Sequence, residues 1–127
     1  MNTASVESHP RVLVVDDNED TAETVAIILR HAGHDVRLAH SGQAALETAI
    51  AFHPEAVILD LGLPGMDGYE VARRIRETPS LGGVRLIAVS GYAQEGDRRR
   101  SKEAGVDVHL AKPVEPVRIQ QILAGLR

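Results

Sequence analysis

The sequence predicts an α/β protein in which a parallel β-sheet is covered by helices on both faces. Short β-branched runs alternate with segments of helical periodicity along the chain, in the pattern βαβαβαβαβα. The runs are apolar at successive positions, which is typical of parallel strands that are buried on both faces. Apolar residues make up 43% of the 127 residues, enough for the core of one domain. Alternation of this kind favours a layered α/β fold over a bundle or a sandwich.

The first strand is predicted over residues 11–15, and the pair Asp16 and Asp17 follows it directly. Asn18 is a typical N-cap for the helix that comes next. The apolar residues of this helix are spaced as i, i+3, i+4 and i+7, at Ala22, Val25, Ala26 and Leu29. Gly33 is placed to end it.

The second strand is predicted over residues 36–39, and Ser41 can cap the helix that follows. The third strand, residues 56–60, is again an apolar run, and its last residue is Asp60. The next residues, 61–66, form a loop by their glycine and proline content.

After this loop, Asp67 and Glu70 resemble a capping box, in which two side chains and two backbone amides bond reciprocally at a helix start. The rest of the chain predicts two more strands and two more helices, at residues 84–89, 94–104, 106–111 and from Pro116 onward. The helix over 94–104 is nearly all polar, and its run from Arg98 to Lys102 is expected to be a solvated face.

The residues at the strand ends carry the chemistry. In open parallel sheets, ligands bind beyond the carboxyl ends of the strands. Four predicted strands end at or beside a reactive side chain: Asp16 and Asp17, Asp60, Ser90, and Lys112. The second strand ends at His40 and adds no evident group. Three carboxylates, a hydroxyl and an ammonium group are therefore expected at one edge of the sheet.

Clustered carboxylates repel one another unless a cation lies among them, and oxygen ligands of this kind suit Mg²⁺. A carboxylate can also act as a nucleophile and form an aspartyl phosphate. Metal, ammonium and hydroxyl together would neutralise and orient the phosphoryl oxygens. The group as a whole thus indicates phosphoryl transfer onto a carboxylate. Taken singly, each residue has an ordinary alternative as a helix cap, a turn residue or a surface charge.

Four motifs match a known family over roughly Arg11 to Leu126. They are Val14-Val-Asp-Asp17, Ile58-Leu-Asp-Leu-Gly-Leu-Pro-Gly-Met-Asp-Gly68, Ala88-Val-Ser90 and Leu110-Ala-Lys-Pro113. With them the chain resembles the receiver domain of two-component response regulators. The resemblance implies a flavodoxin-like fold, with five parallel strands in the order 2-1-3-4-5.

The same resemblance implies a role for each matching residue. Asp60 corresponds to the phospho-acceptor, and Mg²⁺ would be held by Asp16, Asp17, Asp60 and the backbone carbonyl of Gly62. Ser90 corresponds to the switch hydroxyl, and Lys112 to the lysine that contacts the phosphoryl group. The resemblance also implies a cis peptide bond between Lys112 and Pro113.

Two positions depart from the family pattern. His109 stands three residues before the lysine, where the family often has Tyr or Phe, and Val114 follows Pro113 where many members have Phe. This histidine and the loop sequence Leu-Gly-Leu-Pro-Gly look most like receivers attached to hybrid histidine kinases. Two interpretations of His109 stay open, an altered switch that works with Ser90 or a residue on an exposed strand edge.

A receiver of this kind implies a phosphohistidine donor, on a histidine kinase or a histidine phosphotransfer protein, and a downstream target that the sequence does not identify. It would be a signalling switch and not an enzyme acting on other molecules. The net charge of −4 and the three aromatic residues argue against direct nucleic-acid binding. No long apolar run or export signal is present, so we expect a cytoplasmic protein without membrane insertion. Residues 1–10 are expected to be a flexible tail, and residues 11–127 the receiver domain.

Three rival functions have weaker support. A scaffold that works without phosphate would not need Asp60, Ser90 and Lys112 together. Hydrolases with an aspartate nucleophile often carry a second aspartate two residues later, where this chain has Gly62. A flavin protein of the same fold needs a phosphate loop rich in Ser, Thr and Gly after the first strand, where this chain has Asp16 and Asp17.

Overall fold

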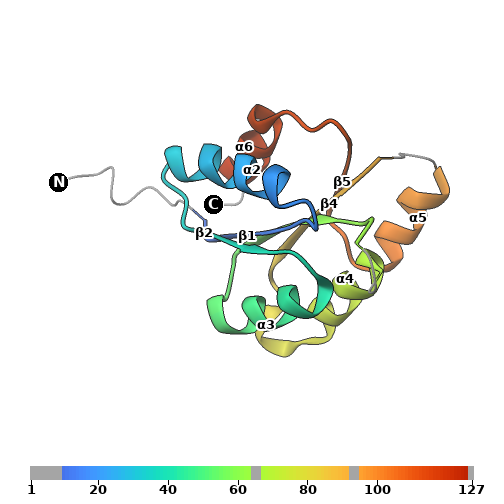
Figure 1. Ribbon diagram of the computed structural model, residues 1–127. Helices are drawn as coiled ribbons and strands as arrows, with labels where there is room; N and C mark the ends of the chain where they lie inside the picture. The colour runs from blue at the N-terminus through green and yellow to red at the C-terminus, as the bar shows by residue number, and fades with distance from the viewer. Residues whose placement is uncertain (1–9, 64–66, 92–94, 126–127) are drawn as a thin grey trace.

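The computed structural model describes residues 10–63, 67–91 and 95–125. Its elements run in the order β1 (Val12–Val15), α2 (Glu19–His31), β2 (Val36–Ala39), α3 (Gly42–Phe52), β3 (Ala56–Asp60), α4 (Gly68–Glu77), η1 (Pro79–Leu81), β4 (Arg85–Ser90), α5 (Glu95–Glu103), β5 (Val108–Ala111) and α6 (Pro116–Ala124). All neighbouring strands pair in parallel, in the order β2-β1-β3-β4-β5 (Figure 1). The predicted fold class and strand order are confirmed.

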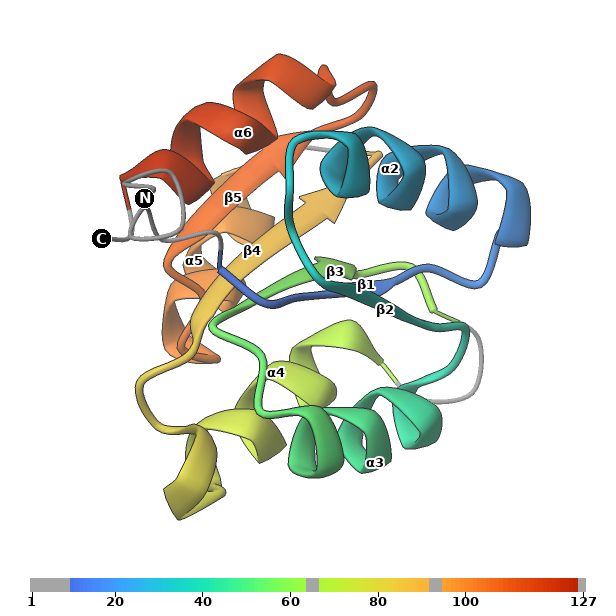
Figure 2. The ribbon, with the colours of Figure 1, turned by 90° about the vertical axis from the view of Figure 1, so that its left-hand side faces the viewer.

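Helices cover both faces of the sheet. Figure 2 shows α2 and α6 on one side of the strands and α3 and α4 on the other. Successive residues of a strand point to opposite faces, so each strand supplies two cores. Val12 and Val14 of β1 pack with α2 and α6, whereas Leu13 and Val15 pack with α3 and α4. This double burial explains why the strand sequences are apolar at successive positions.

The helix ends follow local sequence signals. Asn18 accepts a hydrogen bond from the Thr21 amide, and Ser41 accepts one from the Ala44 amide, so both predicted caps are confirmed. Gly33 follows α2 with a φ of 99°, a left-handed conformation that glycine adopts without strain.

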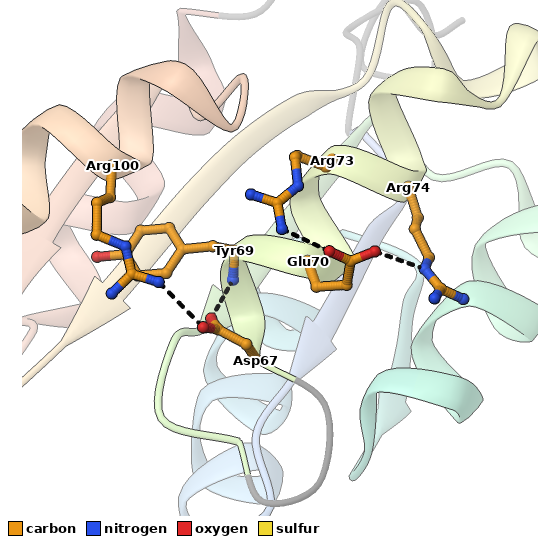
Figure 3. Close-up of polar contacts among 6 residues, drawn as sticks. All are labelled: Asp67, Tyr69, Glu70, Arg73, Arg74 and Arg100. Carbon is orange, nitrogen blue, oxygen red and sulfur yellow. Dashed lines mark hydrogen bonds and ion pairs between the residues drawn. The ribbon is translucent and has the colours of Figure 1, made fainter.

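The capping box predicted at the start of α4 is wrong. Asp67 is the N-cap, but its Oδ1 accepts from the amide of Tyr69 at 2.8 Å rather than from Glu70. The Glu70 carboxylate does not turn back, because it pairs with Arg73 and Arg74 on the following turn (Figure 3). Two nearby guanidinium groups therefore prevail over the single amide that a capping box offers.

Other boundaries differ by a few residues. Strand β4 includes Ser90, β5 is shorter than predicted, and η1 was not predicted. Pro10, which we expected in the tail, is buried, and its carbonyl accepts a hydrogen bond from His34 Nδ1 at 3.0 Å. Residues 1–9 lie outside the described residues. The Lys112–Pro113 peptide bond is cis, as predicted. Within the described ranges, no helix is long and apolar enough to cross a membrane.

Candidate functional site

Three carboxylates meet where β1 and β3 end. Asp16 and Asp60 are buried, with 8% and 7% of their surface exposed, whereas Asp17 is exposed. One oxygen from each of the three lies within 4.8 Å of the others. The strands bring the pair together because β1 and β3 are neighbours in parallel register, so their carboxyl ends lie at the same edge. The predicted acidic cluster is therefore formed, and its donor set suits a hard cation such as Mg²⁺.

The backbone around the cluster holds two of the acids in place. Asp16 Oδ1 accepts from the amide of Asn18, and Asp60 Oδ1 accepts from the amide of Gly62, both at 2.9 Å. Burial raises the pKa of Asp16, and the negative charge of Asp60 raises it further, against the opposing effects of the Asn18 amide and Lys112. Ionised Asp16 is thus destabilised by its surroundings, which a bound cation would relieve.

Lys112 completes the environment of Asp60. Its Nζ donates to Asp60 Oδ2 at 3.1 Å, so the two oxygens of Asp60 have different partners, an amide and an ammonium group. The lysine side chain is 41% exposed, so its ammonium group can move to a new anion without leaving a buried site. It follows β5, which is separated from β3 by β4. The structure therefore brings this predicted residue to Asp60 as well.

Ser90 is the last residue of β4, one position beyond Val89, which pairs with Asp60 of β3. Its Oγ lies 2.8 Å from Nε2 of His109 on β5. The other ring nitrogen of His109, Nδ1, lies 2.9 Å from Oγ of Ser101 on α5. His109 is half-buried, so the interpretation as an exposed edge residue does not fit.

Two residues of this region were missed in the sequence. His40 follows β2, and its Nδ1 donates to the carbonyl of Asp16 at 2.9 Å, which ties the end of β2 to the acidic loop. The sequence signal that could have identified His40 was its position directly after a strand. Ser101 lies on a polar helix, where nothing in the sequence distinguishes it from a solvent-facing residue, yet only 2% of its surface is exposed.

An open cavity of about 460 Å³ adjoins the acids. Asp16, Asp60 and Lys112 form its polar end, and the rest of its lining is mainly apolar, including Val25, Val89 and Val114. A small group on Asp60 would therefore be reached from solvent through this opening. The arrangement offers an oriented carboxylate, a cation site and an ammonium group that can stabilise negative oxygens.

Comparisons with known proteins agree with this chemistry. The family of the response regulator receiver domain matches residues 12–124. The polar-differentiation response regulator DivK of Brucella ovis is 29% identical over 81% of this chain and 84% of its own length.

Two solved structures are similar over more than nine-tenths of this chain. The receiver domain of the sensor histidine kinase PA1611 from Pseudomonas aeruginosa PAO1, with magnesium in its active-site cleft, is 32% identical with a TM-score of 0.84; the match covers 94% of this chain and 98% of that one. A response regulator from Burkholderia pseudomallei with a phosphorylated aspartic acid and calcium is 32% identical with a TM-score of 0.81. This second match covers 92% of this chain and 66% of that one.

Proposed function

The chain belongs to the family of response regulator receiver domains and is a phospho-accepting receiver of two-component signalling, in which we propose that Asp60 is the acceptor. The observation that carries this proposal is the pair of contacts that Asp60 makes. One oxygen is held by the Gly62 amide at 2.9 Å and the other by the Lys112 ammonium group at 3.1 Å. The carboxylate is thereby oriented at the end of the central strand, beside the cavity.

The step follows from this geometry. A carboxylate oxygen of Asp60 attacks the phosphorus of a phosphohistidine, and an O–P bond forms as the P–N bond breaks. The electron pair of the P–N bond stays on the donor nitrogen, which takes up a proton from solvent and leaves as imidazole. The product is an acyl phosphate on Asp60. Lys112 then moves from the carboxylate to a phosphoryl oxygen, and Ser90 donates its hydroxyl hydrogen to another. The two contacts stabilise the negative charge of the phosphoryl oxygens, which is absent before Asp60 is phosphorylated.

Asp16, Asp17, Asp60 and the backbone carbonyl of Gly62 would hold Mg²⁺ in this site. Bound there, the ion supplies positive charge that offsets both the acids and the phosphoryl oxygens. The grouping of three carboxylate oxygens within 4.8 Å supports this assignment, as does the raised pKa of Asp16. The magnesium in the PA1611 receiver supports it further.

Membership of the receiver family also supports a wider role for the chain, with a phosphoryl donor and a downstream target. We assign residues 11–127 to the receiver domain and residues 1–9 to a tail, with the buried Pro10 between them. The donor would be a histidine kinase or a histidine phosphotransfer protein in the cytoplasm. The chain would change its affinity for a downstream protein on phosphorylation, and would promote no reaction besides its own phosphorylation and dephosphorylation. The net charge of −4 supports a protein target over a nucleic acid.

Mass spectrometry of the intact chain tests the acceptor. After incubation with Mg²⁺ and acetyl phosphate, we expect one added phosphoryl group, and none on Asp60→Asn. Asp35→Asn is a matched control, because Asp35 is exposed and lies in the loop before β2, outside the acidic cluster. It should be labelled like the wild type. Equal labelling of Asp60→Asn would show that another residue is the acceptor.

A further inference from the structure

A chain of side-chain contacts leads from the switch serine to helix α5. Ser90 Oγ lies 2.8 Å from His109 Nε2, and His109 Nδ1 lies 2.9 Å from Ser101 Oγ. The three residues come from β4, β5 and α5, which are separate elements on one side of the molecule (Figure 2). The imidazole thus bridges two hydroxyl groups through both of its ring nitrogens.

We propose that Ser101 and His109 are positioning residues that aim the hydroxyl hydrogen of Ser90 at the phosphoryl group on Asp60. The proposal rests on the function proposed above, because it concerns the same phosphoryl group. It adds a residue of α5 to the machinery and assigns a direction to each hydrogen bond of the chain.

The direction follows from counting hydrogens. A phosphoryl group only accepts hydrogen bonds, and a serine hydroxyl has one hydrogen to donate. When Ser90 donates to the phosphoryl group, it can contact His109 only as an acceptor, so Nε2 must carry a hydrogen. A neutral imidazole has one N–H, which leaves Nδ1 as an acceptor. Ser101 must then donate to Nδ1.

The opposite arrangement withholds the hydrogen. If Nδ1 carries the N–H, it donates to Ser101, and Ser90 donates to the bare Nε2. The heavy atoms need not move, but Ser90 no longer has a hydrogen for the phosphoryl group. Phosphorylation therefore selects the Nε2–H form, in which Ser101 donates to Nδ1 and holds the ring with Nε2 toward Ser90.

The location of Ser101 gives this coupling a structural consequence. Ser101 lies near the end of α5 with 2% of its surface exposed, and His109 is half-buried between it and Ser90. A displacement of α5 that breaks the contact between Ser101 and Nδ1 would free the ring to turn away from Ser90. A protein that binds α5 could thus alter how readily Asp60 is phosphorylated.

The form of the ring can be measured directly by NMR of the full chain with ¹⁵N-labelled histidine. His109→Gln assigns the signals of His109 among the six histidines. With Mg²⁺ and beryllofluoride, a mimic of the acyl phosphate, we expect the Nε2–H form, and we expect Ser101→Ala to move the Nδ1 signal because that nitrogen loses its hydrogen-bond donor. An Nδ1–H ring in the loaded wild type would overturn the proposal, as would an unchanged Nδ1 signal in Ser101→Ala. Failure of beryllofluoride to bind would instead contradict the proposed function.

Phosphorylation rates with acetyl phosphate give a second readout. Ser101→Ala should be phosphorylated roughly two- to tenfold more slowly, the range of one lost hydrogen bond. His109→Gln keeps an N–H near the Nε2 position, so it should retain more of the rate than His109→Met, which has similar bulk and no donor. Ser80→Ala, at an exposed serine of η1, is the matched control and should match the wild type. Equal rates for His109→Gln and His109→Met would overturn the positioning role.

Discussion

The guanidinium group of Arg100 lies over the ring of Tyr69, with 4.1 Å between the guanidinium carbon and the ring centroid. The same guanidinium pairs with Asp67, the N-cap of α4, at 3.1 Å (Figure 3). Tyr69 is buried, with 6% of its surface exposed, and its position is therefore fixed by the core. One arginine of the polar helix α5 thus attaches that helix to the beginning of α4, next to the loop that leaves Asp60.

Replacing Arg100 with alanine should lower the free energy of unfolding by about 0.5–1 kcal/mol, because an exposed cation–π contact and a surface ion pair are both lost. Arg100→Lys should restore part of the loss, since an ammonium group keeps the charge but not the planar stacking. Denaturation by urea measures the change. Arg99→Ala is the control, because Arg99 is also exposed on α5. If Arg99→Ala lowers the free energy of unfolding as much as Arg100→Ala does, the contact with Tyr69 contributes nothing specific to stability.

Gly68 is a second point where the site depends on close packing. A Cβ at this position would lie 2.6 Å from Leu61 Cα and 3.0 Å from the Asp60 carbonyl oxygen. Both are backbone atoms, so they cannot rotate away. Gly68→Ala should destabilise the protein by about 1–3 kcal/mol, as overpacking does, and should slow phosphorylation by displacing Asp60.

Gly83→Ala is the matched control, because a Cβ there would meet no atom within 4 Å. Its stability should stay within about 0.5 kcal/mol of the wild type. Urea denaturation and the rate of labelling by acetyl phosphate are measured on both variants. A Gly68→Ala protein with wild-type stability and labelling rate would mean that the backbone at Asp60 and Leu61 can shift without any loss of stability or rate.

The strand ends could be predicted from sequence because the rule involved is topological. Parallel strands place their carboxyl ends at one edge, so Asp16, Asp60 and Lys112 had to meet whatever their side-chain conformations. The contacts of Glu70 and Ser101 could not be predicted in the same way. The contacts of Glu70 depend on which of several nearby partners its side chain reaches. Ser101 is buried because α5 lies against β5, and the polar sequence of α5 does not predict that placement.

Asp16 should weaken the fold when the metal is absent. Burial and the charge of Asp60 hold its pKa above the ordinary value of 3.8. Between 3.8, the pKa of Asp16 in the unfolded state, and its raised pKa in the folded state, the folded state binds more protons than the unfolded state. The free energy of unfolding therefore falls as the pH rises through this range. Without metal at pH 7, Asp16→Asn should have a higher free energy of unfolding than the wild type.

The control for this prediction is Asp20→Asn. Asp20 is exposed in the first turn of α2, where a negative charge is favourable, so removing it should lower stability slightly. Urea denaturation in EDTA compares the variants at several pH values. An Asp16→Asn protein that is less stable than the wild type would indicate that the Asn18 amide outweighs the repulsion.

Mg²⁺ affinity should depend on Asp17. Its carboxylate is the exposed member of the cluster, and loss of one anionic ligand weakens a site whose affinity follows its charge. We expect Asp17→Asn to bind Mg²⁺ roughly tenfold or more weakly in a calorimetric titration. Asp20→Asn again serves as the control, three residues away and outside the cluster. Equal affinities for Asp17→Asn and the wild type would remove Asp17 from the site.

Helix α5 should open more readily than α2. In α2, Asn18 caps the first turn, and Ala22, Ala26 and Leu29 are fully buried against the sheet. Among the residues of α5 whose side chains are described, 99–103, Ser101 is the buried one, and its hydroxyl contacts His109. A helix that buries little apolar surface gains little stability from tertiary packing. The polar sequence of α5 adds little further stability.

Hydrogen exchange followed by mass spectrometry should therefore show faster exchange in peptides from α5 than in peptides from α2. Arg100→Ala should accelerate exchange in α5 and leave α2 unchanged, because it removes the contacts with Tyr69 and Asp67. Beryllofluoride with Mg²⁺ should slow exchange in α5 if Ser101 is held by the hydrogen-bonded ring of His109. Ser101→Ala should abolish this slowing while α2 stays protected. Equal protection of α5 and α2 in the free protein would mean that contacts other than buried apolar side chains hold the helix.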